Sequence, residues 1–418
     1  MSAGSFCEWR KLPVNLVELC INTTLRCGQS FRWQKFADDE WRCVLRGRIV
    51  ALRQDTTHLH YRSCFAPRAS ALPTPPSSVP PCPGEESERS DDTEALIRYY
   101  FALDLNLSEL YEQWSTADPN FRKKALQFTG IRILRQDAWE ALISFICSSN
   151  NNIARISQMV EKLCIHYGPL IGYVDEKPYH DFPTPSALAV NGVEARLREL
   201  GFGYRAKYIY RTALIVANQH EEGWLDSLSN PESPPFGVEV KPAGEMGEHG
   251  REGYRQAHES LLDLQGVGPK VADCVCLMGL GWGESVPVDT HVWQIAQRDY
   301  KFGKGKHKSL TKATYDAVAD HFRKLWGKNA GWAHSVLFTA DLKTFSERLT
   351  VKTEVDVTVL KKIKVSEDSD AHAAVKKEVS TRVAVKREIS EEEESKTLVE
   401  NTTINTRSTR KRRRTRKD

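Results

Sequence analysis

A lysine and an aspartate, 19 positions apart, are the residues of this chain best suited to chemistry. They are Lys270 and Asp289, in the stretch LQGVGPKVADCVCLMGLGWGESVPVDTHVW, residues 264–293. An amine held in a desolvated pocket loses its proton more readily and becomes a nucleophile near neutral pH. A carboxylate facing it can stabilise a developing positive charge. The same pattern also fits a buried aspartate that only caps the helix beginning at THVWQIAQRD.

The elements that must hold these two side chains are a helix, a tight turn and a second helix. Gly266 and Gly268 allow positive φ and a close approach of the backbone. Pro269 suits the first turn of the second helix, where its missing N–H costs little. The turn amides and the helix N-terminus then form an anion site suited to a DNA phosphate. A Gly-x-Gly alone fits a plain helical hairpin equally well.

The remaining sequence predicts an α+β chain in three parts. Residues 1–128 contain short alternating segments typical of strands, in FRWQKF, EWRCVLRGRIVALRQD and HLHYRS. They indicate an N-terminal antiparallel β-sheet domain with helices. The Pro-, Ser- and acid-rich stretch 67–94 is expected to be a disordered surface insertion.

Residues 129–345 show helical periodicity and are expected to form a mostly α-helical part. Its helix-hairpin-helix is placed at about 255–290, and residues 230–253 are expected to be a loop insertion. The pattern SSNNN interrupts one helical stretch, and Gly201 and Gly203 mark a turn between two others.

Residues 346–418 are predicted to be a disordered basic tail, because they are charged and poor in aromatic residues. From 351 on they carry 18 Lys and Arg against 13 Asp and Glu, whereas the whole chain has a net charge of only +4. The end, RSTRKRRRTRKD, indicates nuclear import or nonspecific attraction to nucleic acid, or simply a solvated tail. The tail from 351 on thus has a net charge of 18 − 13 = +5, which leaves the first 350 residues at 4 − 5 = −1. Because this part is nearly neutral, it must meet any anionic partner with a local basic surface.

Composition excludes several other classes of protein. The chain has 418 residues, 40% hydrophobic and 27% charged, without an apolar run long enough to span a membrane. The first residues contain no apolar signal core, so secretion is not expected. The ten cysteines form no Cys-x-x-Cys pair, which argues against a zinc or iron–sulfur site.

Six motifs in order carry a resemblance to a known family: GQSFRW, SFICSSNNNIARI, LGFGYRAKYI, VGPKVADC, VPVDTHVW and AGWAHSVLFTADL. Together they resemble the helix-hairpin-helix Gly/Pro/Asp superfamily of base-excision DNA glycosylases. Within it they look like the 8-oxoguanine DNA glycosylases. The resemblance covers roughly residues 10–345, without the two insertions.

The resemblance implies roles for individual residues. Lys270 would attack C1′ of the damaged nucleoside and form a Schiff base that permits strand nicking, and Asp289 would stabilise the oxocarbenium-like charge. The Gly28 carbonyl would accept the N7–H that only oxidised guanine carries. Phe338 and Cys274 would sandwich the base, although core packing is the simpler explanation for either residue alone.

Further residues would hold the DNA. Asn150, Arg155 and Arg205 would read the cytosine left opposite the flipped base, and Tyr204 would wedge into the gap. His291 would contact a phosphate, as would the hairpin glycines. A structural cation would be held by three backbone carbonyls of the hairpin, those of Leu262, Leu264 and Val267.

One departure from the family bears on specificity. His334 stands where the family typically has a glutamine that reads the Watson–Crick edge of the base. A histidine has fewer donor and acceptor sites than an amide, and its charge depends on pH. Gln265 and Pro269 also depart from the usual hairpin residues, but both are tolerable in a turn.

The sequence therefore predicts a bifunctional DNA glycosylase/AP lyase that removes 8-oxoguanine opposite cytosine. Two alternatives stay open: a related glycosylase with a shifted base preference, and a noncatalytic helix-hairpin-helix DNA-binding protein. No redox or nucleotide cofactor is expected to be required. The one bound ion that the resemblance implies is the structural cation at the hairpin. The expected partner is double-stranded DNA containing oxidised guanine, with no membrane, for a monomer in the nucleus with a mitochondrial fraction not excluded.

Overall fold

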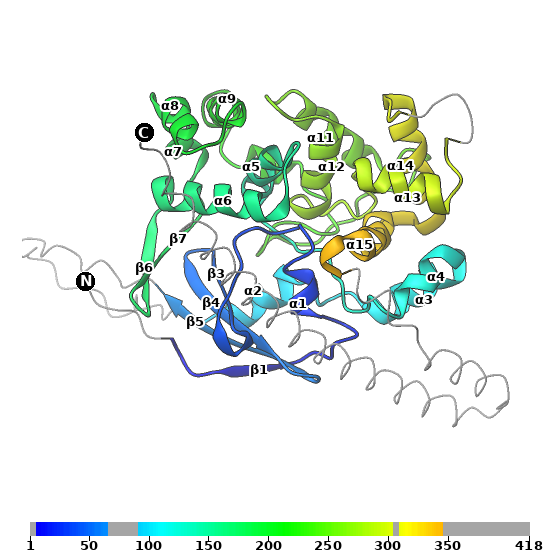
Figure 1. Cartoon of the computed structure of the whole chain (residues 1–418), viewed down its shortest axis with the longest axis horizontal. Helices are drawn as coiled ribbons and strands as arrows, with labels where there is room; N and C mark the ends of the chain where they lie inside the picture. Colours follow the sequence, from blue (N-terminus) through cyan, green and yellow to red (C-terminus); the bar gives the residue numbers. More distant parts are fainter. Residues whose placement is uncertain (1–5, 66–90, 304–308, 346–418) are drawn as a thin grey trace, which may run out of the picture. The chain divides into compact units, whose positions relative to one another are not determined.

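The computed structural model describes residues 6–65, 91–303 and 309–345 (Figure 1). All of them belong to Met1–Ser346, the first of two units into which the chain divides. The tail predicted from residue 346 lies outside the described residues, as does most of the insertion predicted at 67–94. The last two residues of that insertion, Thr93 and Glu94, are helical and open α2 (Thr93–Tyr100).

The N-terminal part is built on a five-stranded antiparallel sheet in the order β1-β5-β4-β3-β2. Arg46 and Gly47 join two of these strands with φ of 45° and 73°, the left-handed pair that a two-residue hairpin turn requires. The predicted antiparallel sheet is confirmed, although its edge strand β1 was not anticipated. The strands are β1 (Arg10–Pro13), β2 (Gln34–Lys35), β3 (Trp41–Leu45), β4 (Arg48–Gln54) and β5 (His58–Phe65).

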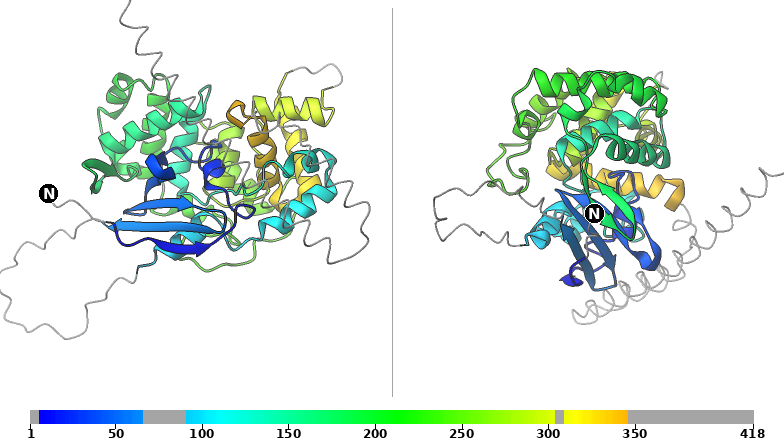
Figure 2. Two further views of the ribbon diagram at one scale, coloured as in Figure 1. Left: turned by 60° about the horizontal axis from the view of Figure 1, so that its bottom comes forward. Right: turned by 90° about the vertical axis from the view of Figure 1, so that its left-hand side faces the viewer.

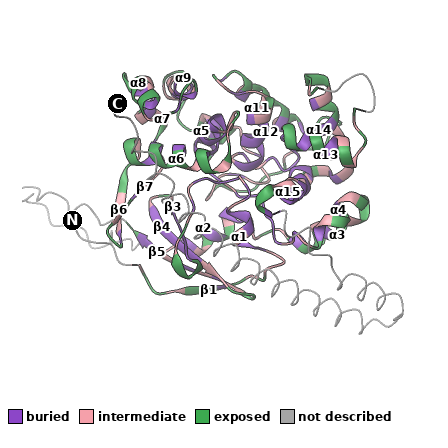
Figure 3. Cartoon of the chain, viewed as in Figure 1, coloured by how far each residue is buried: buried purple, intermediate pink, exposed green. Residues whose placement is uncertain are grey.

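One face of this sheet is covered by α1 (Ile21–Thr24) and α2, which share a core with the strands. That core contains Trp33, Trp41 and Tyr100, and the indole N–H of Trp33 donates to the Tyr100 hydroxyl at 3.0 Å. Figure 3 shows the strands buried where they face these helices. The segment between β1 and β2, which contains α1 and the GQSFRW motif, is thereby fixed at the side of the sheet.

The helical part forms one continuous core around α5, in which every residue except Ser148 is buried. A helix that is apolar all round is typical of the centre of a domain. Figure 1 shows most of the surrounding helices above the sheet, with α3 and α4 to one side of it, and Figure 2 gives two further views. The first of them are α3 (Leu107–Ala117), α4 (Pro119–Ala125), α5 (Ala138–Ser148), α6 (Ile153–Tyr167), α7 (Pro185–Leu188), α8 (Val193–Glu199), α9 (Arg205–Asn218) and α10 (Trp224–Ser227).

The predicted helix-hairpin-helix consists of α11 (Glu252–Leu262) and α12 (Pro269–Met278), joined by residues 263–268. The remaining helices are α13 (Thr290–Asp299), α14 (Lys312–Trp326) and α15 (Ala330–Asp341), with short 3₁₀ turns at Ala37–Asp39, Gly327–Asn329 and Lys343–Phe345. Helices α5 and α12 pack side by side, so two of the family-like motifs meet at the centre of the unit.

The prediction that residues 129–345 are mostly α-helical is confirmed, and one short β-hairpin interrupts the helices. Residues Leu170–Val174 (β6) and Lys177–His180 (β7) form an antiparallel hairpin. Val174 and Tyr179 pack with Val44 and Ile49 of the first sheet, so tertiary contacts support these short strands. Asp175 and Glu176 take positive φ in the turn, and this pair lacks the Asn-Gly or Asp-Gly signature of such turns.

Two further expectations concern loops. Between Leu228 and Arg251 the chain forms neither helix nor strand, which matches the loop predicted at 230–253 except for its last two residues, Glu252 and Gly253, which are helical. The boundary predicted near residue 128 falls in the connection between α4 and α5. Within the described ranges, no helix is both long and apolar enough to cross a bilayer.

Candidate active site

Six of the residues singled out in the sequence line one small cavity between the GQSFRW segment and α5, α12 and α15. The cavity has a volume of about 50 Å³. Since an engineered cavity of about 150 Å³ holds a single benzene molecule, a purine base enters this smaller one only if lining side chains move. The predicted residues in its wall are Gly28, Lys270, Cys274, Asp289, His334 and Phe338, joined by Cys27, Gln29, Phe145, Met278, Pro287, Ser335 and Thr339.

Lys270 enters the cavity from the first turn of α12. Pro269 opens that helix, as the sequence predicts, and Gly268 is its N-cap. The half-buried Lys270 amine donates to the Ser148 hydroxyl at 3.2 Å and lies 5.1 Å from the centre of the Phe145 ring. The nucleophile candidate is therefore held by α5, and within the described residues no ion pair joins it to Asp289.

Asp289 fits both interpretations that the sequence left open, a helix cap and a carboxylate beside Lys270. Its Oδ1 accepts the backbone N–H of Val292 at 2.9 Å and so caps α13. The same residue lines the cavity beside Lys270. Capping fixes the carboxylate at the start of a helix, where the macrodipole also stabilises its negative charge. The capping and the catalytic interpretations of Asp289 therefore describe one geometry.

Gly28 reaches the cavity in a left-handed conformation, with φ of 86°. An added Cβ would lie 3.1 Å from Ile153 Cδ1, so both the backbone and the available space favour glycine. The next residue, Gln29, is fixed by its side chain, which donates to the Arg132 carbonyl at 2.8 Å and accepts from Leu134 N–H at 3.0 Å. The Gly28 carbonyl thus belongs to a backbone segment held from both sides.

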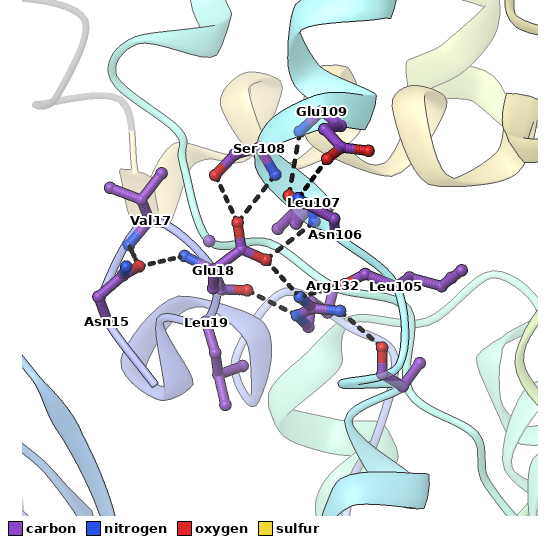
Figure 4. Close-up of polar contacts among 12 residues, drawn as sticks. Asn15, Val17, Glu18, Leu19, Leu105, Asn106, Leu107, Ser108, Glu109 and Arg132 are labelled. Atoms are coloured by element: carbon purple, nitrogen blue, oxygen red, sulfur yellow. Dashed lines mark hydrogen bonds and ion pairs between the residues drawn. The ribbon is translucent and has the colours of Figure 1, made fainter. Parts of the chain in front are cut away.

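Arg132 is in turn the centre of a buried polar cluster shown in Figure 4. It donates to the Glu18 carboxylate at 2.7 Å and to the carbonyls of Glu18, Ala102 and Leu105. Glu18 also accepts the Leu107 and Ser108 amides at the start of α3. These amides, the Ser108 hydroxyl and Arg132 outweigh burial and lower the pKa of Glu18. The cluster ties the chain before Gly28 to α3 and to the strand-like segment at 131–136.

Cys274 and Phe338 face the cavity from α12 and α15. Burial raises the pKa of the Cys274 thiol to about 11, so it is neutral at physiological pH and presents an apolar surface. Phe338 is half-buried, and its ring lies 6.0 Å from that of His291, edge to face. The two predicted faces of a base sandwich therefore line the same cavity.

His334 lies on α15 one turn before Phe338 and is 94% buried. Burial lowers the pKa of its imidazole to about 4, although the nearby Asp289 and Asp273 carboxylates oppose this shift. The ring is therefore neutral at physiological pH. Neither ring nitrogen makes a well-formed hydrogen bond to another described residue. Because buried polar groups are almost always paired, these two atoms are suited to meet a polar partner in the cavity.

The residues expected at the opposite strand gather where α5 ends and α9 begins. The Tyr204 hydroxyl, from a side chain that is 48% exposed, donates to the Ser149 carbonyl at 3.1 Å. Arg205 donates to the same carbonyl and to that of Asn150, which has a φ of 48°. Arg205 itself is only 3% exposed, so it must turn outward before it can read a base. Arg155 is exposed near the start of α6.

The two hairpin glycines have different backbone conformations. Gly266 has a φ of 80°, and a Cβ there would lie 2.6 Å from the Tyr208 ring. Gly268 has a φ of −107° and is extended, so it does not use the positive φ that glycine allows. No atom of the described residues lies within 4 Å of the point that a Cβ would occupy, which leaves open space in front of the α12 amides. Gly268 therefore offers close approach and not unusual backbone geometry.

The remaining predicted residues lie around the hairpin and α13. His291 is half-exposed, and its Nδ1 lies 3.9 Å from an Asp341 oxygen. The carbonyls expected to hold a cation come from the end of α11 and the turn, and that of Leu264 accepts Val267 N–H at 3.3 Å. No cluster of three or more His, Cys, Asp or Glu in the described ranges is arranged to hold a metal ion.

Sequence reasoning missed two residues of α5 that contact the Lys270 amine. Phe145 and Ser148 both lie in the SFICSSNNNIARI motif, three positions apart, and so project from the same side of α5. That spacing was the available signal. What it could not supply was the packing of α5 against α12, which brings these side chains to Lys270.

Comparison with known proteins agrees with this geometry. Residues 11–142 match the family model described as 8-oxoguanine DNA glycosylase, N-terminal domain. Residues 143–326 match the model described as HhH-GPD superfamily base excision DNA repair protein. The junction of the two matches lies within α5, whose side chains support the Lys270 amine.

Two known proteins are similar to most of this chain. An N-glycosylase/DNA lyase of Saccharomyces cerevisiae is 36% identical over 404 residues, covering 90% of this chain and 96% of that protein. The N-glycosylase/DNA lyase OGG1 of Arabidopsis thaliana is 34% identical, covering 80% of each chain.

Solved structures share the fold. MBOgg1 in complex with a low-affinity DNA ligand superposes with a TM-score of 0.60 at 25% identity, covering 81% of this chain and 98% of that one. Clostridium acetobutylicum 8-oxoguanine glycosylase/lyase, bound to DNA with cytosine opposite 8-oxoguanine, gives 0.57 at 25% identity, covering 77% and 91%. The chain therefore belongs to the 8-oxoguanine DNA glycosylase family of N-glycosylase/DNA lyases, in the HhH-GPD superfamily of base excision DNA repair proteins.

Proposed function

We propose that this N-glycosylase/DNA lyase removes 8-oxoguanine paired with cytosine, with Lys270 as nucleophile and Asp289 as its electrostatic partner. One observation carries the proposal: residues from three distant segments, all named from the sequence, line a single cavity. C1′ of a nucleotide is inaccessible in stacked duplex DNA, so the damaged nucleotide must rotate out of the helix. The small cavity opens to admit its base.

In the proposed recognition, one hydrogen bond distinguishes 8-oxoguanine from guanine. The Gly28 carbonyl accepts the N7–H of 8-oxoguanine, and guanine would present an unprotonated N7 to the same oxygen. A site that leaves a buried acceptor unpaired rejects the wrong ligand strongly. Cys274 and Phe338 contact the two faces of the base, while neutral His334 offers one donor and one acceptor to its edge.

In the proposed reaction the unprotonated Lys270 amine attacks C1′. The bond from C1′ to the base breaks, and its electron pair leaves with the base, which then takes up a proton. Asp289 stabilises the positive charge that develops on the sugar. The sugar ring opens to a Schiff base between Nζ and C1′. Loss of a proton from C2′ and departure of the 3′ phosphate then cleave the strand by β-elimination.

The proposed DNA interface has two parts. Asn150, Arg155 and Arg205 read the cytosine left behind, and Tyr204 fills the gap in the stack. The amides of the hairpin turn and of the first turn of α12 bind a phosphate, with His291 at a neighbouring one. A cation on the carbonyls of Leu262, Leu264 and Val267 would be structural, and titrating duplex binding with K⁺ at constant ionic strength would reveal it.

The proposal includes a monomer that works in the nucleus. The basic end of the tail at 410–417 supports nuclear import. A fluorescent fusion lacking these residues should lose its nuclear accumulation if they act as the import signal. Light scattering of the purified chain, alone and with DNA, measures the oligomeric state.

The test of specificity is excision from four duplexes carrying 8-oxoguanine opposite each normal base. The proposal expects the fastest single-turnover excision opposite cytosine, and no excision by the Lys270→Gln variant. Strong excision opposite adenine would refute the cytosine-reading set. If Lys270→Gln excises like the wild type, the assigned nucleophile is wrong.

His334 favours one alternative, a shifted preference among oxidised bases. A ring with one donor and one acceptor cannot reproduce the contacts of a glutamine amide. Relative excision rates on a panel of oxidised purines, for the wild type and for His334→Gln, separate the two possibilities. An identical ranking in both proteins would exclude a role for His334 in choosing the base.

A further inference from the structure

A buried carboxylate on the catalytic helix lies outside the cavity and has no part in the proposed reaction. Asp273 stands one turn after Lys270 on α12 and is 1% exposed. Its Oδ1 accepts the Tyr254 hydroxyl at 2.6 Å and the Ser285 hydroxyl at 2.7 Å, and its Oδ2 accepts the Tyr315 hydroxyl. Such a carboxylate is stable in the interior only because donors surround it.

Tyr315 makes a second contact that the other donors do not make. Its hydroxyl oxygen, while donating to Asp273, accepts the backbone N–H of Val288 at 3.3 Å. Val288 is 1% exposed and directly precedes Asp289. A buried amide needs a partner, and here the partner comes from α14 and not from the local backbone. The two hydrogen bonds share one oxygen atom.

We infer that Tyr315 is a positioning residue that holds Asp289 in register with Lys270. The bridge runs from α12, which carries Lys270, through the Asp273 carboxylate and the Tyr315 hydroxyl to the Val288 amide. Asp289 follows directly, and its own carboxylate is fixed to α13 by the cap. Neither catalytic candidate bonds to the other, so their relative position depends on such indirect links.

Charged groups around the bridge support this arrangement. His258 Nε2 lies 3.8 Å from Asp273 Oδ2, and Arg323 donates to the Tyr254 hydroxyl at 3.4 Å. Burial and the Asp273 carboxylate both raise the pKa of Tyr315 well above its ordinary value, so its hydroxyl keeps its proton and continues to donate. The Tyr315 hydroxyl therefore remains a donor to Asp273 at neutral pH.

The chain supplies a matched control. Tyr254→Phe and Tyr315→Phe each remove one hydroxyl that donates to the same carboxylate, and each leaves an aromatic ring of nearly the same size. Only Tyr315→Phe also removes the acceptor of the Val288 amide. Ser285→Ala is a second control, because its hydroxyl serves Asp273 and the backbone of α12 without touching Val288.

The experiment compares single-turnover excision of 8-oxoguanine opposite cytosine with the dissociation constant for a duplex holding an uncleavable abasic analogue. Misplacing a reacting group by about 1 Å can cost a hundredfold in rate, so Tyr315→Phe should slow excision about tenfold or more. Its dissociation constant should stay within about twofold of the wild type. Tyr254→Phe and Ser285→Ala should lose less than about threefold in rate. Their melting temperatures should fall by about as much as that of Tyr315→Phe.

The outcomes separate this role from a general loss of stability. Equal slowing in Tyr315→Phe and Tyr254→Phe would mean that Asp273 only stabilises the fold. A wild-type rate in Tyr315→Phe would show that the bridge does not position Asp289. The inference rests on the proposed function, and a wild-type protein that excises no base would instead refute that function.

Discussion

Replacing His334 with glutamine tests directly whether the cavity holds a neutral histidine. Burial lowers the pKa of His334 to about 4, against about 6.5 for an exposed imidazole. In the unfolded chain the ring gains a proton as the pH falls through 6.5, whereas in the folded chain it stays neutral until about pH 4. Over that window the unfolded state binds more protons, so acid must lower the free energy of unfolding.

The size of the effect follows from the shift. A difference of about 2.5 in pKa, at 1.36 kcal/mol per unit, corresponds to about 3 kcal/mol. That stability is fully present above pH 6.5, falls progressively between 6.5 and 4, and is lost below 4. The Asp289 and Asp273 carboxylates reduce the shift and Lys270 increases it, but burial is the largest cause.

The assay is urea denaturation of the wild type and His334→Gln at pH values from 7.5 to 4.5. Other ionisable groups titrate in both proteins, so the difference between the two free energies of unfolding isolates His334. We expect this difference to be constant between pH 7.5 and 7. By pH 4.5 the wild type should have lost about 2.5 kcal/mol of its free energy of unfolding relative to His334→Gln. A difference that stays flat over the whole range would show that the ring is solvated or already charged in the folded protein.

Four further predictions concern single sites. Gly266→Ala should lower the free energy of unfolding by more than about 1 kcal/mol, because φ is positive and an aromatic ring fills the space; thermal melting measures it. Gly268→Ala should cost less than about 1 kcal/mol and yet weaken duplex binding, since its methyl would stand before the phosphate-binding amides; retained affinity would refute this. Arg132→Gln should cost about 3 kcal/mol in urea denaturation, because it removes the buried charged donor to the Glu18 carboxylate and to the carbonyls of Glu18, Ala102 and Leu105. Asp289→Asn should slow single-turnover excision about a hundredfold without changing the affinity for an abasic-analogue duplex, and an unchanged rate would remove it from the mechanism.

The sequence predicts the candidate site better than it predicts the fold around it. Gly28, Lys270 and Phe338 are far apart in the chain, and no periodicity brings them together. Their motifs resemble those of one family, and the structure places them around one cavity. At Gly268 the sequence allowed either a positive φ or a close backbone approach, and the structure shows an extended residue with open space beside it.

The features that sequence reasoning missed depend on tertiary packing. The β6–β7 hairpin is short, and its Asp175-Glu176 turn carries no strong signal, so contact with the first sheet decides its conformation. Ser148 and Tyr315 are ordinary helix residues by pattern. Each becomes part of the site only because α5 and α14 come to lie against the hairpin and the segment before α13.

Borohydride trapping with the wild type and the Lys270→Gln variant tests the central claim most directly. Reduction of a Schiff base during reaction with a duplex carrying 8-oxoguanine opposite cytosine should link the wild-type chain covalently to the DNA through Nζ of Lys270. Peptide mapping of the adduct identifies the attached residue, and Lys270→Gln should bind the duplex but form no adduct. An adduct of wild-type yield in Lys270→Gln, or base excision by the wild type without any adduct, would contradict the assignment of Lys270 as the nucleophile.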